Sequence, residues 1–186
     1  MYTINIMDSL TIENEVTEHS PEEIFSELQT PPTDADKDLI SRAFYFGLRA
    51  HTGQKRKSGE PYFNHVFATG RNLARLQMDA TTIAAGIMHD VLEDTPVTDE
   101  EMRVEFGDEV VFLVQGVTKL GTLKYQGIER HAESLRKFFV AMAHDIRVVV
   151  IKLADRLHNL STLQYLPPEK QKRIAIEALE IHARLA

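Results

Sequence analysis

The sequence contains no cysteine, and among its 186 residues 21 basic side chains are outnumbered by 28 acidic ones. Without cysteine, disulfide bonds and thiolate metal sites are excluded, which fits a cytoplasmic protein. The net charge of −7 disfavours a general nucleic-acid binder, because such proteins are usually basic. No apolar run approaches the roughly 20 residues of a membrane span, and the N-terminus lacks the basic and then apolar stretch of a secretory signal. We therefore expect a cytoplasmic protein that binds neither nucleic acid nor a membrane.

The apolar residues follow a helical pattern along most of the chain. Leu39, Ala43 and Phe46, for example, recur at the spacing of one helix face. The run 148–151 is β-branched, but it continues into a segment with helical spacing, so we predict a buried helix from Ile146 to about Leu163. The length and the 43% hydrophobic content suit one domain with a sizeable core. The sequence thus predicts an all-α bundle of about eight to ten helices.

The domain boundaries are expected near residue 34 and beyond the last residue. We interpret residues 1–34 as an N-terminal extension with a first helix from Pro21 to about Leu28, and residues 35–186 as the main domain. A loop at 121–127 and a long amphipathic helix at 128–144 are also predicted. The chain ends inside a helix without a glycine cap or a breaker, so we expect it to be part of a longer protein.

The stretch Gly86–Thr95, GIMHDVLEDT, contains the most unusual residues of the chain. His89 and Asp90 lie in an apolar segment that we predict to be one helix from about Asp79 to Thr95. A buried ionisable pair needs a cation or a hydrogen-bond network. Glu93 and Asp94 follow Asp90 by three and four residues, so they belong to the same helix face one turn further on.

A second polar face occurs on the apolar helix near the C-terminus. Lys152, Asp155, Asn159 and Thr162 recur there at intervals of three and four residues. Asp155 is the natural fourth ligand for a metal ion held by His65, His89 and Asp90. Two imidazoles and two carboxylates suit a first-row divalent ion such as Mn, Fe, Co or Zn, whereas Ca and Mg prefer oxygen ligands.

Each of these residues also has an ordinary interpretation. A single histidine such as His65 is more often a hydrogen-bonded or surface residue than a ligand. We read five further histidines in that way: His51, His131, His144, His158 and His182. Glu93 and Asp94 could be a solvated helix end, or could orient an attacking water beside the metal and take its proton. The basic residues 55–57 could be a solvated loop, or could hold positive charge for a phosphate at the mouth of the site.

Four segments together resemble the hydrolase domain of the RelA/SpoT family of alarmone synthetase/hydrolases, a branch of the HD phosphohydrolase superfamily. They are HTGQKRKSGEPYFNHV (51–66), AAGIMHDVLEDT (84–95), FGDEVVFLVQGVTKL (106–120) and VVVIKLADRLHNLSTL (148–163). The resemblance covers about residues 35–186. It implies an HD-domain helical bundle that hydrolyses ppGpp and pppGpp to GDP or GTP plus pyrophosphate in the stringent response, usually with Mn(II). In long family members a synthetase domain follows, so the resemblance also implies a possible synthetase domain in a longer parent chain.

The resemblance also implies roles for individual residues. The metal ligands would be His65, His89, Asp90 and Asp155, and the catalytic acid pair Glu93 and Asp94. Nucleotide contacts would come from Arg56, Lys57 and Ser58 in the basic loop, and the nucleoside pocket would include Asn159 and Thr162. Two alternatives stay open: an HD phosphohydrolase for another nucleotide, such as a deoxynucleoside triphosphate or NADPH, and a non-catalytic regulatory module that binds the alarmone.

Overall fold

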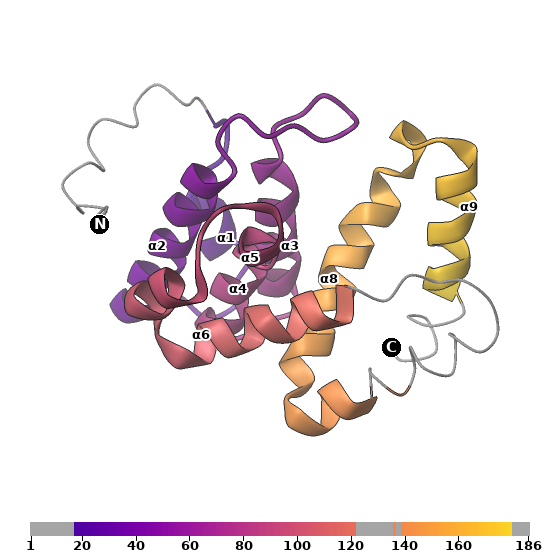
Figure 1. The fold of residues 1–186 in the computed structure, drawn as a ribbon. Coiled ribbons are helices and arrows are strands. Elements are labelled where there is room, and N and C mark those ends of the chain that lie inside the picture. The colour runs from indigo at the N-terminus through magenta and orange to yellow at the C-terminus, as the bar shows by residue number, and fades with distance from the viewer. Residues whose placement is uncertain (1–16, 122–135, 137–138, 180–186) are drawn as a thin grey trace.

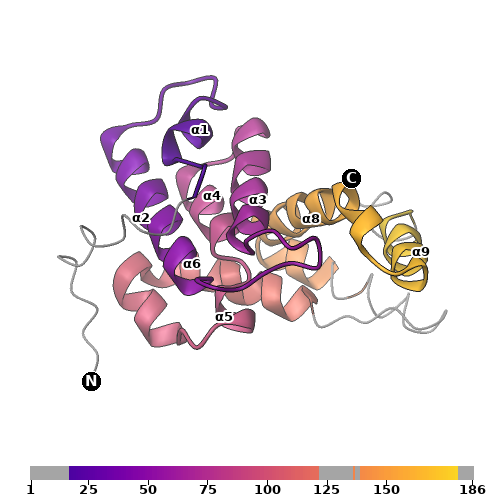
Figure 2. The ribbon, with the colours of Figure 1, turned by 90° about the horizontal axis from the view of Figure 1, so that it is seen from above.

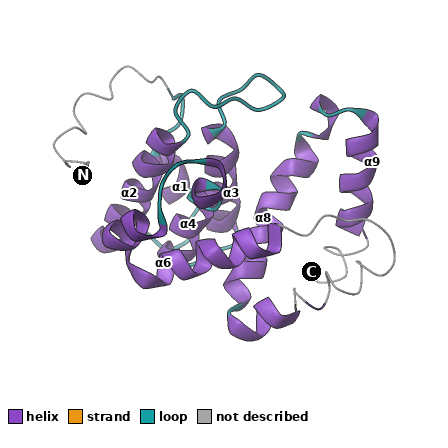
Figure 3. Ribbon diagram, viewed as in Figure 1, coloured by secondary structure: helices purple, strands orange, loops and turns teal. Residues whose placement is uncertain are grey.

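The computed structural model describes residues 17–121, 136 and 139–179 (Figure 1). These residues include eight α-helices with defined bounds and one 3₁₀ turn, and residues 139–144 are helical as well. They contain no strand, which confirms the predicted all-α bundle (Figure 3). The helices are α1 (Pro21–Phe25), α2 (Asp34–Ala50), α3 (Phe63–Arg75), α4 (Ala80–Ile87), α5 (Val91–Asp94), α6 (Asp99–Gly121), α8 (Ile146–Ser161) and α9 (Pro168–Glu177), with the 3₁₀ turn η2 (Leu163–Tyr165) before α9.

Several predictions fall partly or wholly outside this part of the chain. They are the arm before residue 17, the loop at 121–127, most of the helix at 128–144 and the end of the last helix. Within the described residues, α1 ends at Phe25, three residues before the predicted Leu28. No helix in this part of the chain is long and apolar enough to cross a membrane.

The helix starts follow the capping residues in the sequence. The Thr33 hydroxyl accepts a hydrogen bond from the Asp36 amide at 3.2 Å, and the Asp36 carboxylate accepts one from the Thr33 amide, which closes a capping box at α2. Asp79 caps α4 by accepting from the Thr82 amide at 3.0 Å, and Asp145 caps α8 by accepting from the Arg147 amide at 2.9 Å. These caps fix where α4 and α8 begin.

The centre of the bundle is the packing of α3 on α4, with α2 on one side and α8 on the other (Figures 1 and 2). Two glycines allow the close approach of α3 and α4. A Cβ atom on Gly70 would lie 2.4 Å from Ile87 Cγ1, and one on Gly86 would lie 2.2 Å from Leu73 Cδ1. Since real side chains do not approach so closely, a residue other than glycine would force Ile87 or Leu73 to move, so glycine at both positions favours this close packing.

The helix predicted from Asp79 to Thr95 is not continuous. It divides into α4 and α5, and Met88, His89 and Asp90 form a turn between them. Helical hydrogen bonding resumes at Asp90, whose carbonyl accepts from the amide of Asp94 at 2.8 Å. The prediction was therefore wrong about the turn and right about the acids after it, which follow Asp90 by one helical turn. Gly107 divides α6 into two arms, because its backbone has a positive φ of 81° and interrupts the helix there.

Candidate metal centre and adjoining cavity

His65 comes from the first turns of α3 and His89 from the turn between α4 and α5. Both are buried, with exposed fractions of 3% and 1%. The Nδ1 atom of His89 lies 2.8 Å from the carbonyl oxygen of Gly86, so it carries the proton and donates it to this oxygen. That hydrogen bond makes Nε2 the nitrogen of His89 that faces the carboxylates of Asp90 and Asp155.

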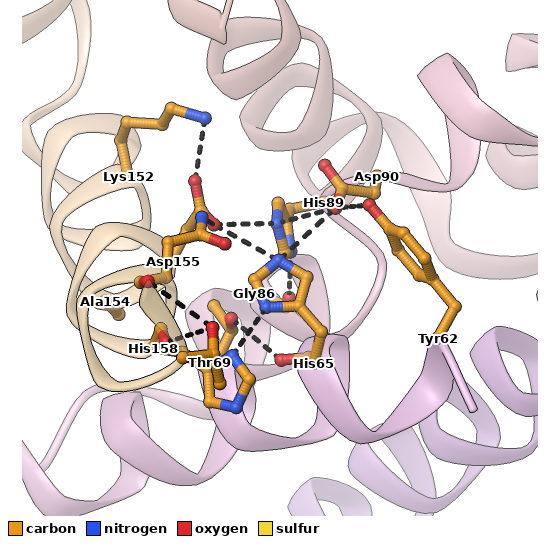
Figure 4. A network of polar contacts seen from close by, with 12 residues as sticks. Tyr62, His65, Thr69, Gly86, His89, Asp90, Lys152, Ala154, Asp155 and His158 are labelled. Atoms are coloured by element: carbon orange, nitrogen blue, oxygen red, sulfur yellow. Dashed lines mark hydrogen bonds and ion pairs between the residues drawn. The ribbon is translucent and has the colours of Figure 1, made fainter. Parts of the chain in front are cut away.

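Two carboxylates approach the two imidazoles (Figure 4). Oδ2 of Asp90 lies 3.5 Å from Nε2 of His65 and 3.2 Å from Nε2 of His89. Oδ1 of Asp155, on α8, lies 3.2 Å and 3.7 Å from the same two nitrogens. Three of the four side chains predicted as metal ligands, His65, His89 and Asp155, therefore have ligand atoms within 4.8 Å of one another. Asp90 is not part of that set, but it lies beside both imidazoles.

The donor atoms fit a divalent metal ion in both spacing and chemistry. A metal–ligand bond of about 2.1 Å places neighbouring donors about 3.0 to 3.4 Å apart, and the four nitrogen–oxygen separations are 3.2 to 3.7 Å. His65, His89 and Asp155 each offer a ligand atom within 4.8 Å of the others, and Asp90 joins them through both imidazoles. The buried Nε2 atom of His89 has no hydrogen-bond partner of good geometry, which is the state expected of a metal-binding nitrogen.

The electrostatics of the cluster favour a cation. Burial by itself would lower the pKa of His89, but the carboxylates of Asp90 and Asp155 outweigh it and raise that pKa to about 10. Burial would likewise raise the pKa of Asp155, yet the ammonium of Lys152 and the two imidazoles hold it well below the usual range. Both carboxylates are therefore ionised, and positive charge between them is stabilised.

Three further side chains hold the ligands from outside. Nζ of Lys152 lies 2.8 Å from Oδ2 of Asp155, the oxygen that does not face the imidazoles. The Tyr62 hydroxyl lies 2.7 Å from Oδ2 of Asp90 and 2.8 Å from Oδ2 of Asp94. Nδ1 of His158 lies 2.9 Å from Nδ1 of His65. Such outer contacts orient metal ligands and tune their affinity.

These three residues were not among the predicted site residues. Lys152 was recognised only as part of the polar face of its helix, Tyr62 was not singled out, and His158 was assigned an ordinary role. Tyr62 does directly follow the basic loop, and His158 lies three residues after Asp155, so both signals were present in the sequence. Neither signal was specific enough without the crossing of α3 and α8.

A cavity of about 400 Å³ opens beside the cluster. This volume is within the usual range for small-molecule sites. Ten of the eleven predicted site residues line it, and the remaining one, His89, is buried beneath. The ten are Arg56, Lys57, Ser58, His65, Asp90, Glu93, Asp94, Asp155, Asn159 and Thr162.

The acid pair and the basic loop lie at different parts of this cavity. Glu93 and Asp94 are exposed on α5, and desolvation together with the charges of Asp90 and Asp94 raises the pKa of Glu93 above its ordinary value. The basic loop is a tight hairpin that projects from the bundle beside α8 (Figure 1). Nη2 of Arg56 donates to Oδ1 of Asn159 at 2.8 Å, which fixes the hairpin to the helix that carries Asp155.

Comparisons with known proteins agree with this geometry. Residues 43–186 match the HD domain family. The chain is 51% identical over 155 residues to a probable guanosine-3′,5′-bis(diphosphate) 3′-pyrophosphohydrolase of Synechocystis, which covers 83% of this chain and 20% of that protein. It is 48% identical over 156 residues to the bifunctional (p)ppGpp synthase/hydrolase SpoT of Escherichia coli, covering 83% of this chain and 22% of SpoT.

A third curated relative is a GTP pyrophosphokinase of Myxococcus xanthus, which is 46% identical over 166 residues. This match covers 84% of this chain and 22% of that protein. The chain thus spans about a fifth of the length of these curated relatives. A solved structure described as a metazoan ortholog of SpoT that hydrolyses ppGpp superposes with a TM-score of 0.63 at 27% identity, covering 84% of this chain and 88% of that one. The chain therefore belongs to the HD domain family, and its relatives agree with the likeness of its motifs to the RelA/SpoT branch.

Proposed function

We propose that this domain is a metal-dependent guanosine-3′,5′-bis(diphosphate) 3′-pyrophosphohydrolase, which converts ppGpp or pppGpp to GDP or GTP plus pyrophosphate. The observation that carries the proposal is the meeting of three features at one cavity: the His65, His89, Asp90 and Asp155 cluster, the acid pair on α5, and the basic hairpin. The names of the relatives support the substrate, since two of them and the metazoan structure refer to ppGpp or its hydrolysis.

The site residues have different roles in the proposed hydrolysis. Water adds to the phosphorus attached to the 3′ oxygen, the bond between phosphorus and this oxygen breaks, and the oxygen takes up a proton as pyrophosphate leaves. Glu93 accepts the proton that the water loses, a role that its raised pKa favours, and Asp94 holds the water in line. A divalent ion on the four ligands would supply Lewis acidity and lower the pKa of water. The donor set of two imidazoles and two carboxylates suits a first-row divalent metal. We propose Mn(II) among these metals, because it is the usual ion of the family that the sequence motifs resemble.

The basic hairpin and α8 bind the nucleotide in this proposal. Arg56 and Lys57 face the cavity and stabilise the charge on the phosphates, which increases as pyrophosphate leaves. Ser58, in the same hairpin, also lines the cavity and would contact the nucleotide, and Asn159 and Thr162 would form part of the nucleoside pocket. A synthetase domain in the parent chain, a cytoplasmic location and a domain boundary at residue 34 remain predictions from the sequence. Of the extension, α1 is described, and its Ile24 is fully buried against the bundle.

The test is release of pyrophosphate from ppGpp with and without added Mn(II), beside an Asp90→Ala variant. Metal-dependent release that the variant lacks would support the reaction, the substrate and the ligand set together. Deoxynucleoside triphosphates and NADPH serve as competing substrates, and faster turnover of either would contradict the assignment to ppGpp. Binding of ppGpp without turnover, by a folded and metal-loaded domain, would instead indicate a regulatory module.

A further inference from the structure

His158 contacts the metal cluster without belonging to it. The residue lies on α8, one turn after Asp155, and is partly buried. Its Nδ1 atom lies 2.9 Å from Nδ1 of His65, and the two ring centroids are 5.0 Å apart (Figure 4). None of the roles proposed for the site residues accounts for this contact between His65 and His158.

The contact determines which nitrogen of each ring carries a proton. Two Nδ1 atoms at 2.9 Å need one N–H and one lone pair between them. The Nε2 atom of His65 faces the carboxylates of Asp90 and Asp155, so it must keep its lone pair to bind a cation. The proton of neutral His65 is then on Nδ1, and the Nδ1 lone pair of His158 accepts it. His158 therefore occupies the place that a carboxylate or a backbone carbonyl takes beside most metal-binding histidines.

The two ligand histidines differ in this respect. His89 donates its Nδ1 proton to the backbone carbonyl of Gly86, which no substitution of a side chain removes. His65 depends on a side chain from another helix, 93 residues away in the sequence. The same Nδ1 atom of His158 lies 3.4 Å from Nη1 of Arg56, so this imidazole also connects the ligand with the basic hairpin.

We propose that His158 is a positioning residue that holds His65 in its Nδ1–H tautomer and thereby sets the affinity of the cluster for its divalent ion. The inference rests on the proposed metal site, but it does not depend on which nucleotide is hydrolysed. It predicts that an acceptor atom at this position, rather than an imidazole as such, is what the site needs.

The experiment is calorimetric titration of the metal-free protein with Mn(II), in the absence of nucleotide. His158→Leu removes the acceptor and should weaken Mn(II) binding by about 10- to 100-fold, the usual effect of losing such a partner. His158→Asn retains an oxygen close to the position of Nδ1 and should recover affinity to within a few-fold of the wild type. His144→Leu, at an exposed histidine near the start of α8, is the matched control and should bind as the wild type does.

Thermal melting of each metal-free variant separates a local effect from a loss of fold. Wild-type affinity in a folded His158→Leu variant would overturn the inference. Equal weakening in the Leu and Asn variants would also overturn it, because it would show that only packing matters. If the wild type binds no divalent ion, the metal site itself fails. If the wild type binds Mn(II) and hydrolyses ppGpp while His158→Leu binds equally well, only the role of His158 fails.

Discussion

The guanidinium of Arg56 donates a 2.8 Å hydrogen bond to the side-chain oxygen of Asn159, across 103 residues of sequence. The amide of Asn159 in turn donates to Oδ1 of Asp155 at 2.6 Å. One asparagine thus connects the hairpin expected to bind phosphate with a carboxylate of the metal cluster. The two halves of the proposed site are one hydrogen-bonded unit.

Replacing Asn159 with Ala should therefore weaken substrate binding. Hydrogen bonds to charged groups contribute about 1.5 to 3 kcal/mol, so we expect KM for ppGpp to rise by about tenfold or more. Steady-state kinetics at saturating Mn(II) would measure this change. Asn64→Ala, at an asparagine of α3 that does not line the cavity, is the control. An unchanged KM would mean that other contacts hold the hairpin.

Glu93→Gln should separate metal binding from catalysis. The amide cannot accept the proton of water, so kcat should fall by about 100- to 1,000-fold while Mn(II) affinity stays within twofold. The acidic limb of the wild-type kcat profile should report a pKa above the ordinary 4.5 of a glutamate, since desolvation and the nearby carboxylates raise that of Glu93. Activity then increases as pH rises through this pKa. Glu100→Gln, at an exposed position of α6, is the matched control. Full activity of Glu93→Gln would exclude Glu93 as the base.

Tyr62→Phe should affect the rate without affecting the fold. The single proton of the hydroxyl can be donated to only one carboxylate at a time, yet the oxygen lies within 2.8 Å of both Asp90 and Asp94. Removing it leaves the proposed metal ligand Asp90 and the proposed catalytic acid Asp94 without this contact, so we expect kcat to fall by about 10- to 100-fold. The ring still stacks on His51, with centroids 4.8 Å apart, so the melting temperature should change little. Tyr45→Phe, on the exposed face of α2, is the control and should have the kcat of the wild type. Equal kcat values for the Tyr45→Phe and Tyr62→Phe variants would contradict the prediction.

Asp145→Ala tests the cap of α8. The side chain accepts from the Arg147 amide and pairs with its guanidinium at 2.7 Å, so its loss should cost about 1 to 2 kcal/mol of unfolding free energy. Arg147 lowers the pKa of Asp145 below 3.8, and this stabilisation is therefore present at neutral pH and lost as pH falls through the lowered pKa. Urea titrations should show a constant difference from wild type between pH 7 and 5, and a smaller one below pH 4. Asp145→Asn keeps a capping oxygen, so it should lose less unfolding free energy than Asp145→Ala. A difference in unfolding free energy that grows as the pH falls would contradict this prediction.

Much of this site could be predicted because its chemistry is local in sequence. His89, Asp90, Glu93 and Asp94 are near neighbours, and the spacing of the two acids after Asp90 places them one helical turn further on. The turn at Met88–Asp90 could not be predicted, since no proline or glycine interrupts the run after Gly86. The contact between His65 and His158 was also beyond sequence reasoning, because it depends on how α3 and α8 cross. Spacing along one helix predicts which residues share a face, but it does not predict what that face meets.

The two glycines between α3 and α4 have a consequence for ion selection. Gly70 and Gly86 set the distance between the helix that carries His65 and the segment that carries His89, and the Gly86 carbonyl also orients the second imidazole. Close packing at these two glycines therefore contributes to the spacing of the two proposed histidine ligands. An alanine at Gly70 should move Ile87 or separate the helices, and we expect it to alter the relative affinities of the site for divalent ions of different radius.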